Sequence, residues 1–124
     1  MKLHADPRTH LNTITGYGPG FIEVNAQQHA SHIIVIPDAP VQPWSIARFN
    51  ALSAQDLQAL CAFQPELVLL GTGWRQRPMD PALVAALAPS GVGLEMMNTP
   101  AACRTYNILM AEGRKVLAAL LIED

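Results

Sequence analysis

Charged residues are scarce in this chain. They make up 15% of its 124 residues, with ten acidic and eight basic side chains, so the formal net charge is −2. Globular proteins carry about 25% charged residues. This deficit predicts a heavily buried sheet together with an apolar contact surface. A small negative charge gives no electrostatic attraction to nucleic acid or to an anionic membrane surface, so we expect neither as a partner.

Cysteines and long apolar runs are also scarce. Cys61 and Cys103 both fall on apolar helix faces, which favours free buried thiols over a disulfide. Cys103 lies near a helix start, which leaves open a lowered thiol pKa. The longest apolar run, residues 116–122, is far shorter than the roughly 20 residues of a membrane-spanning helix. The start, MKLHADPRTHL, lacks the apolar core of a secretory signal. We therefore expect a cytoplasmic protein without direct membrane insertion.

The clearest structural pattern is in the last third of the chain. Residues 92–96 form a short apolar run that predicts a buried strand. Thr99 followed by Pro100 predicts a helix start, with the threonine as the N-cap. One helical face then carries the apolar or small residues Ala102, Cys103, Tyr106, Leu109, Met110 and Gly113. Gly113 is suited to end that helix, and residues 116–122 predict a final strand.

The rest of the chain predicts one domain, residues 1–124, with a loose lead-in at residues 1–10. Residues 11–17, 21–24 and 32–36 are expected to form an antiparallel meander, because Gly18-Pro19-Gly20 is a strong turn signal. Ser53 and Asp56 have the spacing of a capping box at a helix start. A strand at residues 66–70 follows, and then a helix from Asp80-Pro81 to residue 87. This alternation predicts an α/β fold with a largely parallel central sheet and helices on both faces.

A candidate binding pocket is predicted at the strand ends, because ligands of open α/β sheets lie beyond the carboxyl ends of parallel strands. Two segments end there, residues 71–74 and residues 96–99. Their backbone amides, hydroxyls and helix N-terminus are suited to a small anion. The candidate binding residues are Gly71, Thr72, Gly73, Trp74, Glu95, Asn98, Thr99 and Arg104. The alternative is that the glycines only form turns, because the phosphate-loop lysine and the dinucleotide fingerprint are both absent.

Glu95 is the most informative acidic residue. If helices cover both faces of its strand, its carboxylate lies in an apolar layer and needs a partner. The cations available to it are Arg48, Arg75, Arg77 and Arg104. A structural ion pair is favoured over a general base with a raised pKa, because no second carboxylate or histidine is placed to act with it. We therefore assign no catalytic residue.

Metal binding and cofactor binding have no support in the sequence. His29 and His32 would point to opposite faces of a strand, and no third ligand is suggested. We expect no metal site and no cofactor. Residues 74–77 combine a tryptophan with two arginines in an expected loop, which is a composition typical of a protein-contact hot spot, although a solvated loop has the same composition.

Four segments together resemble a known family of small uncharacterised domains. They are the run from Gly91 to Leu121, residues 14–21, Pro43-Trp44 and residues 69–73. The family includes the mitochondrial complex I (NADH:ubiquinone oxidoreductase) assembly factor three and an adipogenesis-associated cytosolic protein. The positions that match its signature are Gly71, Gly73, Glu95, Thr99, Tyr106, Asn107, Glu112 and Arg114, which carry over as signature positions and not as known functional residues.

The resemblance implies a three-layer α/β/α fold with a mixed central sheet, whose last strand runs antiparallel to its neighbours. It implies no established catalytic activity and no cofactor. For the mitochondrial relative it implies a scaffolding role in assembling a membrane enzyme, through contact with another assembly factor. The chain has no mitochondrial presequence, so we expect a prokaryotic member, and its end lacks the proline expected after the last strand.

The leading functional expectation is a non-enzymatic interaction protein that assists assembly of a membrane or respiratory complex through a protein partner. Ile108, apolar on the outer face of the last helix, is compatible with a partner surface. The alternatives are a small-molecule or anion-binding domain at the strand ends, and an enzyme built on Glu95 with an arginine. The sequence leaves the oligomeric state open.

Overall fold

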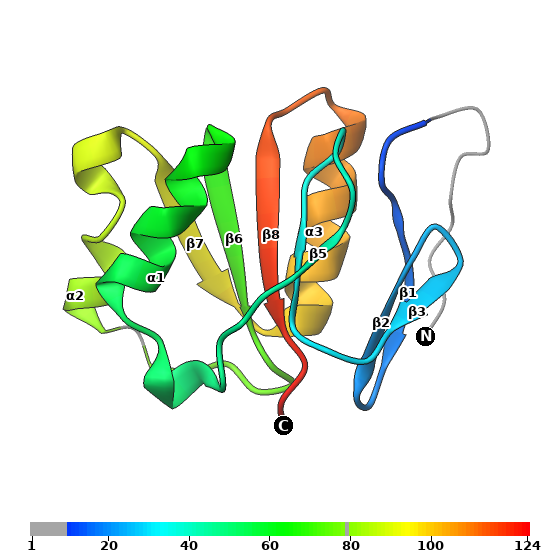
Figure 1. The fold of residues 1–124 in the computed structure, drawn as a ribbon, viewed down its shortest axis with the longest axis horizontal. Helices are drawn as coiled ribbons and strands as arrows, with labels where there is room; N and C mark the ends of the chain where they lie inside the picture. Colours follow the sequence, from blue (N-terminus) through cyan, green and yellow to red (C-terminus); the bar gives the residue numbers. More distant parts are fainter. Residues whose placement is uncertain (1–9, 79) are drawn as a thin grey trace.

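The structure, a computed structural model, describes residues 10–78 and 80–124, so the expected lead-in lies outside the described residues except for His10. Its strands are β1 Ile14–Gly18, β2 Phe21–Val24, β3 Gln27–His29, β4 Ile33–Val35, β5 Gln42–Pro43, β6 Leu67–Thr72, β7 Gly93–Met97 and β8 Val116–Leu121. Its α-helices are α1 Ala54–Ala59, α2 Pro81–Val84 and α3 Thr99–Ala111 (Figure 1). Short 3₁₀ helices span Phe49–Ala51, Leu60–Phe63 and Ala88–Ser90.

The central sheet is mixed, with the strand order β5-β4-β8-β6-β7. β8, β6 and β7 are parallel, whereas β4 runs antiparallel to β8, and β5 antiparallel to β4. The family resemblance implied a last strand antiparallel to both of its neighbours. This prediction is confirmed for β4 and wrong for β6, because β8 runs parallel to β6. The reason is α3, which at ~1.5 Å per residue is long enough to return the chain to the amino end of the sheet before β8 begins.

The meander forms a separate three-stranded sheet of β1, β2 and β3. Its first two strands are confirmed, but its third is Gln27–His29 and not residues 32–36. Asn25 and Ala26 both have positive φ, 52° and 67°, which makes the tight hairpin turn that the sequence analysis missed. β4 instead pairs with β5 and β8, and all three of its residues are buried.

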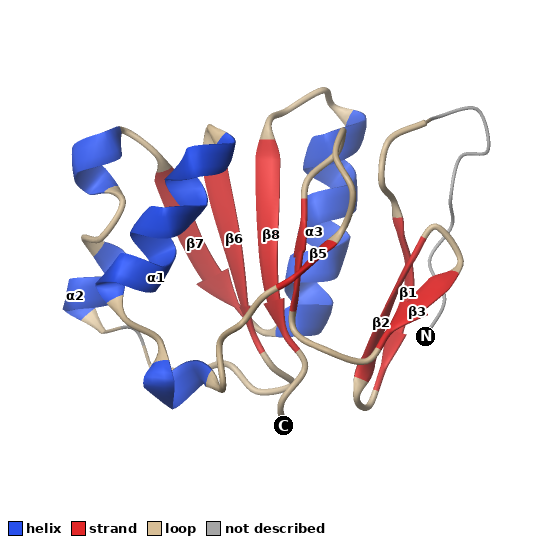
Figure 2. Ribbon diagram, viewed as in Figure 1, coloured by secondary structure: helices blue, strands red, loops and turns tan. Residues whose placement is uncertain are grey.

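The side chains of β8 divide the core into two layers. Leu117, Ala119 and Leu121 pack with apolar residues of α1, α2 and their flanking turns. The alternate residues Val116, Ala118 and Leu120 pack with α3 and with the meander strands β1 and β2. All six are fully buried, as expected for a strand covered on both faces. Figure 2 shows α1 and α3 on opposite faces of the sheet, which confirms the α/β/α layering, with the meander beside α3.

The helix ends follow the predicted capping chemistry closely. Ser53 and Asp56 form the reciprocal capping box of α1. The Asp80 carboxylate accepts from the Ala82 N–H at the start of α2, but this helix ends at Val84, short of residue 87. The N-cap of α3 is Asn98, one residue before the predicted Thr99, and its side chain accepts from the Ala101 N–H.

Gly113 ends α3 as expected. Its φ of 80° is left-handed, and its N–H donates to the Met110 carbonyl while the Arg114 N–H donates to the Leu109 carbonyl. This pair of bonds is the Schellman arrangement that glycine favours. The tight turn leads directly into β8.

Candidate functional site

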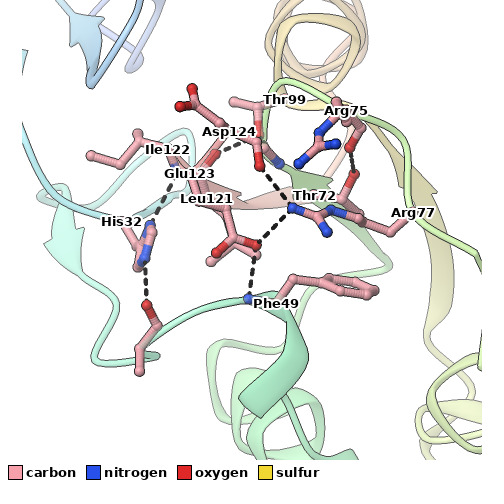
Figure 3. A network of polar contacts seen from close by, with 12 residues as sticks. His32, Phe49, Thr72, Arg75, Arg77, Thr99, Leu121, Ile122, Glu123 and Asp124 are labelled. Carbon is pink, nitrogen blue, oxygen red and sulfur yellow. Dashed lines mark hydrogen bonds and ion pairs between the residues drawn. The ribbon is translucent and has the colours of Figure 1, made fainter.

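The carboxyl ends of β6 and β7 meet at one edge of the sheet, as predicted, and the end of β8, which was not predicted there, joins them. The hydroxyl of Thr99 connects these strand ends. This oxygen accepts from the Gly73 N–H at 2.9 Å and donates to the Leu121 carbonyl at 2.6 Å. The Thr99 N–H donates in turn to the Gly73 carbonyl at 2.7 Å. One fully buried side chain therefore ties β6, β8 and the first turn of α3 together (Figure 3). We call Gly71, Thr72, Gly73, Thr99 and Leu121 the strand-end clasp.

The glycines of the strand-end clasp are needed for close approach. A Cβ on Gly71 would lie 2.7 Å from the Thr99 hydroxyl oxygen and 3.1 Å from the Thr99 Cα. A Cβ on Gly73 would lie 2.3 Å from the Glu123 carbonyl oxygen, and Gly73 has a φ of 96°. No side chain other than hydrogen fits at Gly73, because the collision is with backbone. The space between these strand ends is occupied by the chain itself.

Thr72 and Asn98 at the strand ends also have partners within the chain. The Thr72 hydroxyl donates to the Arg75 carbonyl at 2.8 Å and lies 3.2 Å from the Met97 carbonyl. Asn98 caps α3. The Gly73 N–H and the Thr72 and Thr99 hydroxyls are therefore engaged within the protein, whereas the buried indole N–H of Trp74 has no hydrogen-bond partner among the described residues. A role in binding an anion stays a prediction.

Trp74 and Arg104, the two outer residues of the predicted pocket, lie beside the meander. The Arg104 guanidinium donates to the Tyr17 hydroxyl at 2.8 Å. The Tyr17 and Trp74 rings are 6.1 Å apart between centroids and tilted by 42°. A shallow apolar hollow of about 280 Å³ lies between Tyr17, Gly18, Pro19, Trp74 and Pro100. These residues form an aromatic and proline surface, with no charged side chain in its lining.

The ion-pair hypothesis required Glu95 to be buried in a strand covered by helices on both faces, and Glu95 is not buried in this way. β7 is the last strand of the sheet, and Glu95 at its centre is exposed. Leu94 and Met96 pack toward the α1 layer while Met97 packs toward the α3 layer, because successive side chains of a strand point to opposite faces. Of the four candidate arginines, Arg77 contacts Glu123 and Arg104 contacts Tyr17. Within the described residues, no hydrogen bond or ion pair is made by the Glu95 carboxylate. The strand is half-exposed because α3 lies mainly over β6 and β8.

Two signature residues of α3 attach the meander. The Asn107 side chain accepts from the Ile14 N–H at 2.9 Å and donates to the Ile14 carbonyl at 2.8 Å, as a neighbouring strand would. The Tyr106 hydroxyl donates to the Asn12 carbonyl at 2.8 Å, and burial raises its pKa. These contacts give both residues a structural role.

Glu112 and Arg114, two further residues of the family signature, are exposed. Glu112 is the C-cap residue of α3. Arg114 pairs with Glu66, and this hydrogen bond lowers the pKa of the Glu66 carboxyl. Both partners of this pair are about half exposed, with 46% and 47% of the side chain accessible.

A polar network around the last residues of the chain was missed by the sequence analysis (Figure 3). The Glu123 carboxylate accepts from the Phe49 N–H at 2.9 Å and lies 3.7 Å from the Arg77 guanidinium. Arg77 also donates to the Asp124 carbonyl at 2.7 Å and lies over the Phe49 ring. His32 accepts from the Ile122 N–H through Nδ1 at 3.0 Å. No local sequence signal links these residues, because they are up to 90 positions apart.

A cavity of about 420 Å³ lies at the opposite end of the sheet, between the end of α3 and the start of β8. Apolar side chains such as Ile36, Phe63 and Met110 line it, with Asp38, Arg114 and Lys115. Its volume suits a small ligand. Its lining includes both acidic and basic side chains and lies at the negative carboxyl end of α3. The cavity therefore has no preference for an anionic or a cationic ligand.

The two cysteines are free thiols, as expected. Cys103 is buried and Cys61 is half-buried, and neither is in a disulfide. Burial raises the pKa of the Cys103 thiol from 9.0 to about 12, which contradicts the lowered pKa left open by its place near a helix start. In the described part of the chain, no group of three or more histidine, cysteine or acidic side chains could hold a metal ion.

Comparison with known proteins gives one family and several homologues. Residues 14–121 match the family model described as protein of unknown function (DUF498/DUF598). A crystal structure of a protein from Bordetella parapertussis is 47% identical, with a TM-score of 0.86, and covers 94% of this chain and 100% of that one. An uncharacterised protein of Rhodobacter capsulatus is 40% identical over 108 residues, 87% of this chain and 82% of its own. These bacterial homologues support the expected prokaryotic member.

Vertebrate relatives are named NADH dehydrogenase [ubiquinone] 1 alpha subcomplex assembly factor 3. The one from Xenopus tropicalis is 30% identical over 122 residues, 97% of this chain. The chain spans 66% of that protein and 55% of the bovine one, so the relatives carry additional sequence.

Two findings bear on membranes. A Francisella tularensis relative, 30% identical over 72 residues and matched over 58% of each chain, is named 13 kDa major membrane protein. Across residues 10–78 and 80–124, no helix is long and apolar enough to cross a bilayer.

Proposed function

We propose, from the premise that this chain belongs to the DUF498/DUF598 family of proteins of unknown function, that it is a non-enzymatic interaction protein that assists assembly of a respiratory membrane complex. The observation that carries the proposal is the likeness, over 97% of this chain, to a protein named as an NADH dehydrogenase assembly factor. The partner is a protein, because an assembly factor acts through contacts with other proteins.

The strand ends support a scaffold more than a catalyst. General acid–base or nucleophilic chemistry needs a titratable group that can reach a bound substrate. The Thr99 hydroxyl and the Gly73 N–H are instead bound to each other, and Glu95 lines neither described cavity. Ile108, 60% exposed on α3, and Val84, 41% exposed, provide apolar side chains for a partner to cover.

The test is deletion of the gene in the native host, followed by native gels of solubilised membranes. We expect less fully assembled NADH dehydrogenase and an accumulation of partial complexes, with recovery on complementation. Another respiratory complex of the same membranes, such as succinate dehydrogenase, is the control and should be unchanged. Unaltered levels of assembled NADH dehydrogenase in the deletion strain would refute the proposed role.

The alternative function is anion or small-molecule binding at Gly71–Gly73 and Asn98–Thr99. It requires the Gly73 N–H to exchange the Thr99 oxygen for a ligand. Titration with inorganic phosphate, followed by NMR at the Gly73 and Thr99 amides, tests it. A saturable shift confined to these amides would favour this alternative over the scaffold.

The proposal places the protein in the cytoplasm, at or near the membrane in which the complex is built. The test is fractionation of host cells, with immunodetection of the protein. We expect most of it in the supernatant after a high-salt wash. Retention in washed membranes would contradict this location.

A further inference from the structure

Among residues 10–78 and 80–124, no strand pairs with the outer edge of β7. β7 ends the strand order and pairs with β6 on one side alone. The Gly93 N–H donates to the Glu66 carbonyl, on the β6 side. Since the backbone groups of successive strand residues point to alternate sides, the N–H and C=O groups of Leu94 and Met96 point away from the sheet. The edge therefore offers two donors and two acceptors to a further strand.

The other edge of the sheet differs in this respect. It is formed by β5, which is two residues long and includes Pro43, a residue without an N–H. Short edge strands and prolines are common protection against edge pairing. β7 has five residues and no proline, and its one protective feature is the charge of Glu95.

That charge disfavours pairing between two copies of this chain. If two β7 strands paired antiparallel over their full length, Leu94 would face Met96 and Glu95 would face Glu95. Residue 95 would then be at a non-hydrogen-bonded position, where opposed side chains are closest, at about 4.5–5.5 Å between Cβ atoms. Like charges directly opposite each other destabilise a sheet.

The same charge favours a partner of opposite sign. The Glu95 carboxylate is exposed and interacts electrostatically with the Arg114 guanidinium, but among the described residues no cation lies within ion-pair distance of it. Leu94 and Met96, on the other face of the strand, are half-buried against the α1 layer. A strand added beside β7 would bring one side chain opposite Glu95 and the two flanking side chains beside Leu94 and Met96. Electrostatics and burial together select a cation flanked by apolar residues.

We propose that β7 is a docking strand that accepts an extended segment of a partner protein, with lysine or arginine opposite Glu95 and apolar residues on either side. This inference rests on the proposed function in one respect, namely that the chain acts through a protein partner. Backbone pairing with Leu94 and Met96 supplies the attachment, and Glu95 supplies the selectivity.

The first experiment compares two ten-residue peptides that differ at one position, with a central Val-Lys-Val or Val-Glu-Val. Binding to the full chain is followed by NMR. We expect the lysine peptide to bind about fivefold more tightly, since a cross-strand charge pair and a like-charge pair differ by about 1 kcal/mol. The largest amide shifts should be at Leu94 and Met96.

Two variants control this experiment. Glu95→Lys should reverse the preference of the two peptides, and its side chain is exposed, so the fold is retained. Met96→Pro removes an N–H that points away from β6, so the β6–β7 pairing keeps its bonds while the docking edge loses a donor. Its spectrum reports whether it remains folded, and it should bind neither peptide.

Several outcomes of these experiments would contradict the docking-strand proposal. Equal binding of both peptides, an unchanged preference in Glu95→Lys, or the absence of shifts at Leu94 and Met96 would overturn the docking strand. In host cells, restoration of complex assembly by Glu95→Lys as fully as by the wild type would also overturn it, while leaving the assembly function intact. Failure of the gene deletion to affect assembly would instead remove the proposed function, and the peptide selectivity would still stand on its own.

Discussion

The two ends of the parallel strands β6 and β8 differ in how tightly they are closed. At the carboxyl end, the strand-end clasp leaves no space, and its buried hydroxyls and the Gly73 amide are bonded within the chain. At the amino end there is a cavity of about 420 Å³, an exposed ion pair and a glycine, Gly113, with nothing within 4 Å of an added Cβ. The end where α/β proteins commonly bind ligands is the rigid end here.

Glycine substitutions should give the largest contrast between the two ends. Gly73→Ala combines a left-handed φ with a Cβ placed 2.3 Å from a backbone oxygen, so we expect a loss of roughly 2–5 kcal/mol in the free energy of unfolding. Gly113→Ala also has a left-handed φ, but has open space, so its cost should be roughly 1–2 kcal/mol. Urea unfolding of both variants measures the difference. Equal losses would mean that backbone conformation, and not close approach, determines the cost.

Removal of the clasp hydroxyl should have the next largest effect. Thr99→Val keeps the shape of the side chain but leaves the Gly73 N–H and the Leu121 carbonyl unpaired and buried, at a cost of roughly 2–3 kcal/mol. Thr99→Ser retains the hydroxyl and is the matched control, with a loss of about 1 kcal/mol for one methyl group. Thermal and urea unfolding test this. A serine variant as unstable as the valine variant would show that packing matters more than the two hydrogen bonds.

The reactivity of the two cysteine thiols should differ between the carboxyl and amino ends of the parallel strands. Cys103 lies near the start of α3, at the closed end, with a pKa raised to about 12, whereas half-buried Cys61 lies beside Phe63 of the amino-end cavity. A thiol reagent at pH 8 should modify Cys61 in the native protein and Cys103 only after unfolding.

The raised pKa also predicts a pH dependence. Because the folded state keeps the Cys103 thiol protonated, its contribution to stability is complete below pH 9 and is lost as the pH rises toward about 12. Cys103→Ala should reduce the fall of the urea midpoint over this range. Buried Tyr106, whose pKa is also raised, contributes to what remains.

The smallest effect is expected at the amino-end ion pair. Arg114 and Glu66 are both exposed to solvent, where ion pairs contribute little. Arg114→Met and Glu66→Gln should leave the urea midpoint unchanged at 0.15 M salt. A midpoint as low as that of Thr99→Val would mean that the amino end is as tightly held as the strand-end clasp.

The features that were predicted correctly from the sequence are those that depend on residues close together in the chain. The capping box at Ser53, the Asp80 cap, the apolar face of α3 and the left-handed Gly113 all depend on residues within a few positions of one another. The hairpin at Asn25-Ala26 was missed because alanine at positive φ is unusual and gives no signal. Glu95 was expected to need a partner because the position of β7 at the sheet edge depends on strand order, which no local pattern encodes.

The strand-end contacts could not be predicted from the sequence, because they too depend on how distant elements pack together. Thr99, Gly73 and Leu121 were each predicted from the sequence, as a cap, a turn and a strand residue respectively. That Thr99 bonds to Gly73 and Leu121, 26 and 22 positions away, follows only from the packing of three elements.

The Thr99 hydroxyl has a consequence for the order of folding events. It can make both its bonds only when β6, the first turn of α3 and the end of β8 have all reached their final places, so it belongs to the last steps of assembly and not to the nucleus. Its loss should therefore accelerate unfolding while leaving the refolding rate nearly unchanged. The lifetime of the native state would then depend in part on a single oxygen atom.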